Sequence, residues 1–191
     1  RGKDGAREFF EEGMFSTFKQ VYEYACEDVP VTIYYAFKQS ETETSNDVES
    51  TASTGWETML SAIIRAGFSI TGTWPMRTEM ASRMIASGTN ALASSIVLVC
   101  RKRPEGAPMG TRRDFVVALK RELHAALDEL RSSNIAPVDL AQSAIGPGIG
   151  VYSRFSQVLE ADGSPMTVRA ALQIINQELD AYFSDQDGEL D

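Results

Sequence analysis

Few residues of this 191-residue chain could do chemistry by themselves. The two cysteines, Cys26 and Cys100, lie far apart, on segments that predict a helix and a buried strand. That placement favours core thiols in a reducing, cytoplasmic compartment over a disulfide. His124 is the only histidine and has no Cys or second His at ligand spacing, so no metal site is predicted. Serine-nucleophile signatures and a Cys–His pair are also absent, and no catalytic residue is predicted.

One glycine cluster, at residues 146–150, could in principle bind phosphate. Phosphate loops usually connect a strand to a helix, so that backbone N–H groups point at the ligand. No strand is predicted before this cluster, and Pro147 removes one N–H group. A turn between helices is the preferred interpretation, and no cofactor-binding residue is predicted.

Charge is unevenly distributed along the chain. Residues 1–53 carry a net −6, residues 54–113 a net +5 and residues 114–191 a net −8, which gives −9 for the whole chain. An acidic chain is a poor non-specific binder of polyanions, but a basic middle segment could contact phosphate if the fold exposes it on one face. Ordinary solvated surface charge is the alternative for each single Arg.

The elements that would position these residues follow from hydrophobic spacing. Residues 6–27 predict an amphipathic helix, with Phe10, Met14, Phe18, Val21, Tyr22 and Ala25 on one stripe. Residues 31–37 predict a buried central strand, and the polar residues 39–53 a mobile loop. A capping box at Thr54 begins a helix that Gly67 ends. Residues 68–74 and 95–100 predict two further strands.

The order of these elements predicts an α/β arrangement. The helix between the first two strands favours a right-handed parallel crossover, and the third strand could return antiparallel beside them. Residues 103–110 are rich in Pro and Gly and predict a linker, with an α/β domain over residues 1–104 and a helical appendage over residues 105–191. The appendage has helical spacing over residues 115–130 and 167–183, a short helix from Pro137 and a turn at Asp162-Gly163. No window is apolar enough to span a membrane. Residues 1–5 have neither an initiator Met nor a signal peptide, so we expect this chain to be a piece of a longer polypeptide.

Four segments resemble a known family. They are TGWETMLSAIIRAGFSITGTWPMRTEM at residues 54–80, ASSIVLVCRKR at 93–103, AIGPGIGVYSR at 144–154 and VLEADGSPMTVR at 158–169. They are similar to the C-terminal part of large bacterial and archaeal adenine-specific DNA methylases, which have an N-terminal domain of unknown function and often a zinc ribbon. None of the four segments is a catalytic signature.

The resemblance implies the C-terminal portion of a class I, Rossmann-like methyltransferase sheet, in which the last strand is antiparallel and inserted between its neighbours. The expected strands at residues 31–37, 68–74 and 95–100 would be the fifth, sixth and seventh of that sheet. The family's S-adenosylmethionine loop and its Asp-Pro-Pro-Tyr motif, which binds the amino group of a flipped adenine, lie upstream and do not occur here. S-adenosylmethionine is therefore expected as the cofactor of the parent protein, and no cofactor is expected for this fragment. The expected partners of the fragment are DNA, through the parent protein, and the missing N-terminal part of the same polypeptide.

This map also implies substrate-side residues. The carboxyl ends of parallel strands face the ligand crevice in open α/β sheets, which places Lys38, Trp74, Arg77 and Arg83 on the reactive side. An Arg could neutralise a phosphate and a Trp could stack on a displaced base. The alternatives are a core position for Trp74 beside Pro75 and an ion pair of Arg77 with Glu79.

Three functional hypotheses remain open. The first is an inactive fragment of a DNA adenine N6-methyltransferase. The second is a non-catalytic module that binds DNA or a partner protein. The third is structural, with an appendage that only covers the sheet edge.

Overall fold

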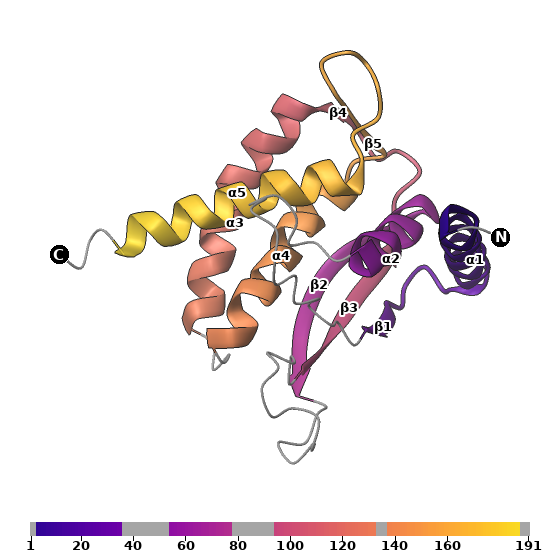
Figure 1. The fold of residues 1–191 in the computed structure, drawn as a ribbon, viewed down its shortest axis with the longest axis horizontal. Helices are drawn as coiled ribbons and strands as arrows, with labels where there is room; N and C mark the ends of the chain where they lie inside the picture. The colour runs from indigo at the N-terminus through magenta and orange to yellow at the C-terminus, as the bar shows by residue number, and fades with distance from the viewer. Residues whose placement is uncertain (1–2, 36–53, 78–93, 133–136, 188–191) are drawn as a thin grey trace.

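The computed structural model describes residues 3–35, 54–77, 94–132 and 137–187. The elements in chain order are α1 (Lys3–Tyr24), β1 (Val31–Tyr35), α2 (Thr54–Arg65), β2 (Phe68–Arg77), β3 (Ser94–Lys102), β4 (Met109–Thr111), α3 (Arg112–Ser132), α4 (Pro137–Ser153), β5 (Gln157–Leu159) and α5 (Val168–Asp187). In Figure 1, α1 and α2 lie with the strands β1, β2 and β3, while α3, α4 and α5 group on the other side of β2. Within this part of the chain, no helix is long and apolar enough to cross a membrane.

β1, β3 and β2 form a three-stranded sheet in that order, and β3 is antiparallel to both neighbours. β1 and β2 therefore run parallel to each other, with α2 between them in the chain. Ile96 pairs with Tyr35 on one side and with Pro75 on the other, so β1 and β2 end at the same edge of the sheet, which we call the carboxyl edge. The predicted parallel orientation of the first two strands and the antiparallel third strand are confirmed, although β3 separates β1 from β2 and the two do not pair with each other.

β1 differs from the prediction. It is described as a strand over Val31–Tyr35, and the remainder of the predicted strand lies outside the described residues. Thr32 and Tyr34 are exposed, and among the described residues β1 pairs only with β3. The prediction of a buried central strand is therefore wrong for this part of the chain. Aromatic and β-branched residues favour an extended backbone whether or not the face of the sheet is covered. The apolar run therefore could not distinguish a partly exposed edge strand from a buried central strand.

α2 begins at Thr54 and ends before Gly67, as predicted. Gly67 has a φ of 106°, and its N–H donates to Ile64 O at 3.1 Å, so the residue closes the helix in a conformation that favours glycine. Trp56 on the buried side of α2 stacks on Tyr35 with 5.5 Å between ring centroids. This stacking joins the start of α2 to the end of β1.

The predicted linker leads into a second, smaller sheet. β4 and β5 pair in parallel, and neither was predicted because three residues are too few for an alternating pattern to be visible. Thr111 then caps α3, since its hydroxyl accepts from the Asp114 N–H at 3.2 Å. In return, the Asp114 carboxylate accepts from the Thr111 N–H at 2.8 Å and from its hydroxyl at 2.7 Å. α3 and α5 confirm the two long helices predicted after the linker.

α4 corrects the interpretation of the glycine cluster. The helix runs unbroken through residues 146–150, which were predicted as a turn. A Cβ atom on Gly146 would lie 1.7 Å from Thr73 Oγ1, and one on Gly148 would lie 2.6 Å from Ile175 Cγ2. The glycines therefore let β2 and α5 approach the helix closely, and this tertiary gain outweighs the low helix propensity of glycine.

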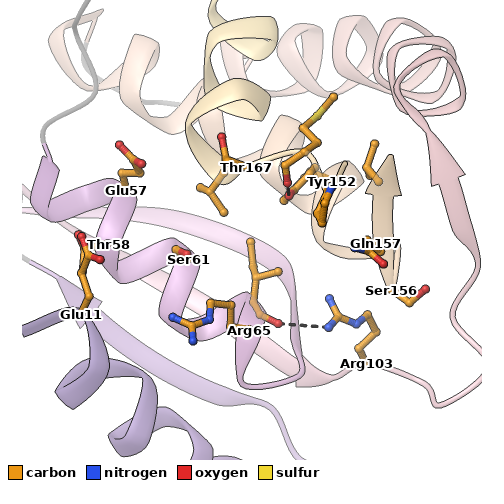
Figure 2. Close-up of a pocket in the computed structure, with 15 residues that line it drawn as sticks. Glu11, Glu57, Thr58, Ser61, Arg65, Arg103, Tyr152, Ser156, Gln157 and Thr167 are labelled. Carbon is orange, nitrogen blue, oxygen red and sulfur yellow. Dashed lines mark hydrogen bonds between the residues drawn. The ribbon is translucent and has the colours of Figure 1, made fainter. Parts of the chain in front are cut away.

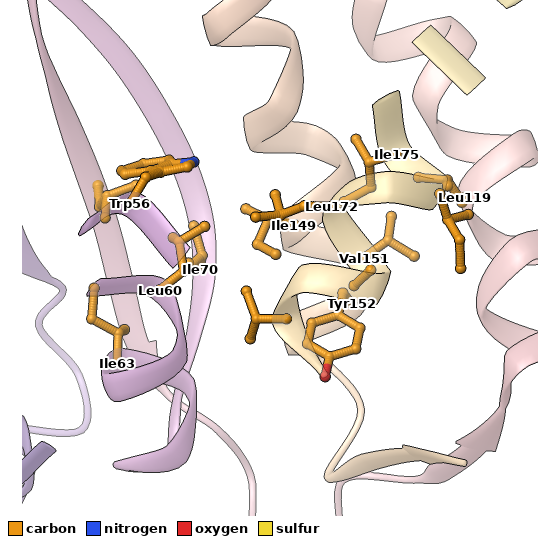
Figure 3. Close-up of a cluster of buried hydrophobic side chains, with 14 of the residues drawn as sticks. Trp56, Leu60, Ile63, Ile70, Leu119, Ile149, Val151, Tyr152, Leu172 and Ile175 are labelled. Carbon is orange, nitrogen blue, oxygen red and sulfur yellow. The ribbon is translucent and has the colours of Figure 1, made fainter. Parts of the chain in front are cut away.

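The buried side chains form one cluster that includes residues on both sides of position 104. Figure 3 shows Leu60 and Ile63 of α2 on one side and Leu172 and Ile175 of α5 on the other. Ile149 of α4 belongs to the same cluster and is fully buried. The two predicted parts of the chain thus share one hydrophobic core.

Candidate functional site

Of the four residues predicted on the substrate side, the structure places two at the carboxyl edge. Trp74 lies near the end of β2 with 65 % of its surface exposed, so the alternative of a core position for Trp74 is wrong. Arg77 is the last residue of β2, and its side chain is not described. Lys38, Arg83 and the predicted loop at residues 39–53 lie outside the described residues.

Trp74 rests on one face of the sheet. Val97 of β3 pairs with Trp74 on one side and with Tyr34 of β1 on the other, so the three side chains form a row across the strands. The indole also extends back over Gly72, where a Cβ atom would lie 3.5 Å from Trp74 Nε1. Val97 is only 6 % exposed, whereas Tyr34 is 62 % exposed. The exposed aromatic rings of Tyr34 and Trp74 therefore flank the buried side chain of Val97.

A groove of about 660 Å³ runs beside Trp74, between β2 and the helices α3 and α4. The β2 wall comprises residues 70–74, and the helix walls comprise Glu122, Ala126, Glu129, Leu130, Gly146, Pro147, Gly150, Val151 and Arg154. Most of these side chains are apolar or absent, and the charged ones come from α3 and the end of α4. The groove is thus an apolar slot with an aromatic residue at one end.

The α4 wall of the groove depends on an unusual hydrogen bond. Pro147 has no N–H to donate to the carbonyl of Ser143 four residues earlier, where an ordinary helix would place a bond. The Thr73 hydroxyl of β2 donates to Ser143 O at 3.5 Å. Further along, the Ile70 N–H donates to Ser153 Oγ at 2.9 Å. Strand and helix are therefore held together by polar contacts at both ends of the wall.

An ion-pair network lies at the α3 side of the groove. Glu122 accepts from Arg154 Nη2 at 2.5 Å and from Arg121 Nη2 at 2.7 Å. Burial opposes ionisation of this carboxyl, but the hydrogen bonds and charges of the two arginines outweigh it and lower the pKa of Glu122. Arg154 is therefore engaged by an acid and is not a free cation for a ligand phosphate.

A second, more polar cavity of about 460 Å³ runs along α2 toward β5 (Figure 2). Its charged lining residues are Glu11, Glu57, Arg65 and Arg103, and Thr58, Ser61, Ser156 and Thr167 supply hydroxyls. Most of its charges have partners. Glu57 accepts from Arg169 Nε at 2.8 Å, and Arg65 lies 3.8 Å from Glu12 and over the Phe15 ring.

Arg103 acts as a structural clamp in this cavity. Its Nη1 donates to Ser153 O at 3.2 Å and to Phe155 O at 3.1 Å, and its Nη2 donates to Ile64 O at 3.1 Å. The guanidinium thus satisfies carbonyls at the C-terminal ends of α2 and α4, where helices leave carbonyl groups unpaired. Burial lowers the pKa of Arg103, although nearby Tyr22 and Tyr152 oppose the shift.

The described residues offer few nucleophiles and no clear metal site. Cys26 is exposed, so the prediction of a core position is wrong for this thiol. Cys100 is fully buried, and burial raises the pKa of its thiol to about 12, so the thiolate is not accessible at neutral pH. His124 is exposed on α3 with its ring centroid 5.2 Å from that of Tyr182. Among the described residues, no three His, Cys, Asp or Glu side chains group closely enough to hold a metal ion.

Several important residues were missed by the sequence patterns. Thr73, Ser143 and Ser153 act through contacts between segments about 70 to 80 positions apart, for which one sequence carries no local signal. The predicted linker over residues 103–110 gave Arg103 no structural role. The one available signal was Pro147 inside a segment of helical length, which requires another donor for Ser143 O.

Comparison of the chain with protein-family models, with curated proteins and with solved structures found no match. The geometry of the Trp74 groove, together with the resemblance of the four sequence segments, is therefore the basis for a function.

Proposed function

We propose that the chain is the C-terminal part of a cytoplasmic, S-adenosylmethionine-dependent DNA adenine N6-methyltransferase and forms the side on which the target base lies. The observation that carries the proposal is the strand arrangement. β1 and β2 run parallel with a helix between them, and β3 is inserted antiparallel between the two. This is the order that the resemblance implies for the last strands of a Rossmann-like methyltransferase sheet.

The described residues do not fit S-adenosylmethionine itself. The only glycine cluster lies inside α4, where β2 and α5 occupy the space beside the glycines. Helix-interior N–H groups are also already used within the helix, so the cluster cannot serve as a loop that binds a cofactor. In the proposal, the cofactor is held by an N-terminal part of the same polypeptide, and no step is assigned to it here.

Trp74 is the residue we assign to the DNA. Its ring is exposed at the carboxyl edge, next to an apolar groove, and a base stacked on an aromatic side chain typically contributes about 1–3 kcal/mol to binding. Displacing a base from a duplex costs a few kcal/mol, which such stacking offsets in part. Arg77, Arg83 and Lys38 would contact phosphates around it, independently of base sequence.

Tryptophan fluorescence tests the base platform directly, because the chain has two tryptophans and the other one, Trp56, is only 2 % exposed. Duplex DNA with an adenine opposite an abasic site should quench the emission, and the quenching should disappear in Trp74→Phe. Trp74→Ala should weaken binding about tenfold, from the lower half of the stacking range. Val117→Ala removes an exposed side chain of α3 and should leave affinity unchanged. Equal affinity of wild type and Trp74→Ala would contradict the assignment.

The phosphate contacts have a separate test. Arg77→Ala with Arg83→Ala should weaken binding to all DNA sequences alike and reduce the slope of log affinity against log salt by about one per lost contact. An unchanged slope would mean that these arginines pair with acids of the chain, where exposed pairs contribute only about 0–1 kcal/mol.

The chain alone should not bind S-adenosylmethionine, and a dissociation constant near the micromolar range, about −8 kcal/mol, would contradict the proposed division of the site.

A further inference from the structure

The polar cavity of about 460 Å³ along α2 has the features of a small-molecule site and is separate from the Trp74 groove. Figure 2 shows Thr58 and Ser61 of α2 on one side of this space and Tyr152 and Gln157 on the other. The charged side chains of its lining are two acids and two guanidinium groups, so the lining carries no net charge. A polar occupant without a large net charge therefore suits this cavity.

One of the two acids comes from α1, whose buried face differs from the predicted stripe. Phe18 and Tyr22 pack on the core as predicted. Phe10 and Val21 are exposed, so that part of the prediction is wrong. Glu11 lies two helical turns before Phe18 and therefore on the same face of the helix, where it lines the cavity.

The cavity contains hydroxyl groups that the protein leaves without a hydrogen bond. Thr58 is only 7 % exposed, yet its hydroxyl has no partner among the described residues. Ser61, one turn further along α2, also has no side-chain partner in this part of the chain. Buried polar groups are almost always satisfied by protein, water or a bound molecule. These hydroxyls therefore indicate a polar occupant.

The start of α5 supplies hydrogen-bond donors to the same cavity. Thr167 caps this helix by accepting from the Ala170 N–H at 3.1 Å, and its carbonyl accepts from the Ala171 N–H at 3.0 Å. The N–H groups of Val168 and Arg169 are left without a partner in the described chain, and Val168 lines the cavity. The first turn of α5 contains no acid. Such a helix start favours a carboxylate or a phosphate.

A carboxylate of the protein lies directly beside this helix start. Glu57 Oε2 accepts from Arg169 Nε at 2.8 Å, and the other oxygen of Glu57 has no partner among the described residues. Glu57 would repel a simple anion at this position, and it would attract an ammonium group. Free N–H groups next to an acid thus match the carboxylate and the ammonium that an α-amino acid carries on one carbon.

The rest of the cavity is rich in hydrogen-bond donors. Arg65 approaches Glu12 only to 3.8 Å, which is longer than a hydrogen bond. Arg103 donates three N–H groups to carbonyls, and a guanidinium has five. The side chains of Ser156 and Gln157 complete this part of the lining. A ligand side chain with acceptor oxygens would be satisfied here.

We propose that this cavity binds a free α-amino acid whose side chain ends in a carboxylate or an amide. The α-carboxylate accepts from the N–H groups at the start of α5, and the ammonium group donates to Glu57. The side-chain oxygens accept from Arg65 and Arg103, and the hydroxyls of Thr58 and Ser61 bond to the polar atoms between these ends. This site does not depend on methyl transfer.

NMR titration of the intact chain with L-glutamate and three analogues tests the proposal. L-Glutamate should shift the amide signals of Val168 and Arg169 in a saturable manner. Glutarate lacks the ammonium group and 4-aminobutanoate lacks the α-carboxylate, so each should bind about tenfold more weakly or worse. L-Leucine keeps the head group but has no side-chain oxygen, and it should bind about fivefold more weakly.

Point variants identify the groups involved. Glu57→Gln should weaken L-glutamate about tenfold and leave glutarate unchanged, because only the ammonium group loses its partner. Glu178→Gln is the matched control, since Glu178 is a similarly covered, ion-paired acid outside the cavity, and it should bind normally. Thr58→Val should weaken L-glutamate about fivefold, and Thr58→Ser, which keeps the hydroxyl, should bind like wild type.

Three results would overturn the proposal. Glutarate that binds as tightly as L-glutamate would mean that the cavity takes an anion alone. Unshifted Val168 and Arg169 signals at about 10 mM L-glutamate would mean that no amino acid binds there. A folded Glu57→Gln protein that loses both ligands equally would mean that the acid only shapes the cavity. The first two comparisons use the wild-type chain and hold even if a variant fails to fold.

Discussion

The glycines of α4 allow a quantitative test of the close approach between helix and strand. Gly146→Ala would place a Cβ atom 1.7 Å from Thr73 Oγ1 and 2.6 Å from both Thr73 Cβ and Thr73 Cγ2. The hydroxyl could rotate away, but Thr73 Cβ is fixed to the backbone, so strand and helix must separate. Overpacking of this kind typically costs about 1–3 kcal/mol, and the separation also breaks the bond to Ser143 O, worth about 1 kcal/mol.

Helix propensity acts in the opposite direction. Replacing glycine by alanine in an exposed helix interior stabilises a helix by about 1 kcal/mol. The net expectation for Gly146→Ala is therefore a loss of about 1–3 kcal/mol. Gly13 of α1 supplies the matched control, because a Cβ atom there would meet no atom of the described residues within 4 Å, and Gly13→Ala should be about 1 kcal/mol more stable than wild type. Gly148→Ala should fall between the two, since its closest contact, Ile175 Cγ2 at 2.6 Å, is less severe than the 1.7 Å contact at Gly146.

Urea unfolding followed by circular dichroism measures the series. With a slope of about 2 kcal/mol per molar, the Gly146→Ala midpoint should fall by about 0.5–1.5 M and the Gly13→Ala midpoint should rise by about 0.5 M. Thr73→Gly should be less harmful in the Gly146→Ala background than in wild type, because it removes the colliding atoms. A Gly146→Ala protein as stable as Gly13→Ala would refute the close approach.

Three further predictions concern the clamp, the cap of α3 and the thiols. Arg103→Met should lower the free energy of unfolding in urea by about 2–3 kcal/mol, because three carbonyl groups lose a charged donor. Arg103→Lys should restore only part of this loss, since one ammonium group cannot replace the planar guanidinium with its several N–H donors. Hydrogen bonds from Thr111 lower the pKa of Asp114, so its contribution to stability is complete above the unfolded-state pKa of about 4 and is lost as the pH falls through the lowered folded-state value. Asp114→Ala should therefore lower the urea midpoint at neutral pH, and the difference from wild type should shrink as the pH falls below about 4; a difference that stays the same in acid would rule out the carboxylate as its source. Ellman's reagent should modify the exposed Cys26 in the native state, whereas Cys100, with its burial-raised pKa of about 12, should react only at the rate of unfolding. Rapid labelling of both thiols in the native protein would contradict the burial of β3.

Local patterns predicted elements well where local chemistry determines the structure. Gly67 ends α2 because the left-handed conformation is inexpensive only for glycine, and the Asp162-Gly163 turn is confirmed by a φ of 81° at Gly163. β3 is antiparallel to β1 and β2, as the order of the elements predicted, whereas its position between them was expected only from the family resemblance. These features depend on neighbours within a few residues or on chain connectivity, and both are visible in one sequence.

Patterns failed where a distant contact determines the local structure. The glycines at 146–150 predict a turn by themselves, but Thr73 and Ile175 occupy the space that side chains would need in the helix. Burial was the least predictable property, since the core position considered for Trp74 is wrong and β1, expected to be central, lies at an edge among the described strands. Periodicity shows that residues are apolar but not which neighbour covers them.

The bond between Ile70 and Ser153 has a consequence for how the chain folds during synthesis. Its partners are 83 positions apart, and the Thr73–Ser143 contact spans 70. Strand β2 leaves the ribosome long before its helical wall exists, and Arg103 emerges about 50 residues before the carbonyls of Ser153 and Phe155. Contacts of such long range must overcome the loop-closure entropy before they contribute, which slows folding. The nascent sheet therefore lacks the helix that packs on β2 until α4 is translated, and a chaperone that recognises apolar segments would have its longest opportunity to bind in that interval.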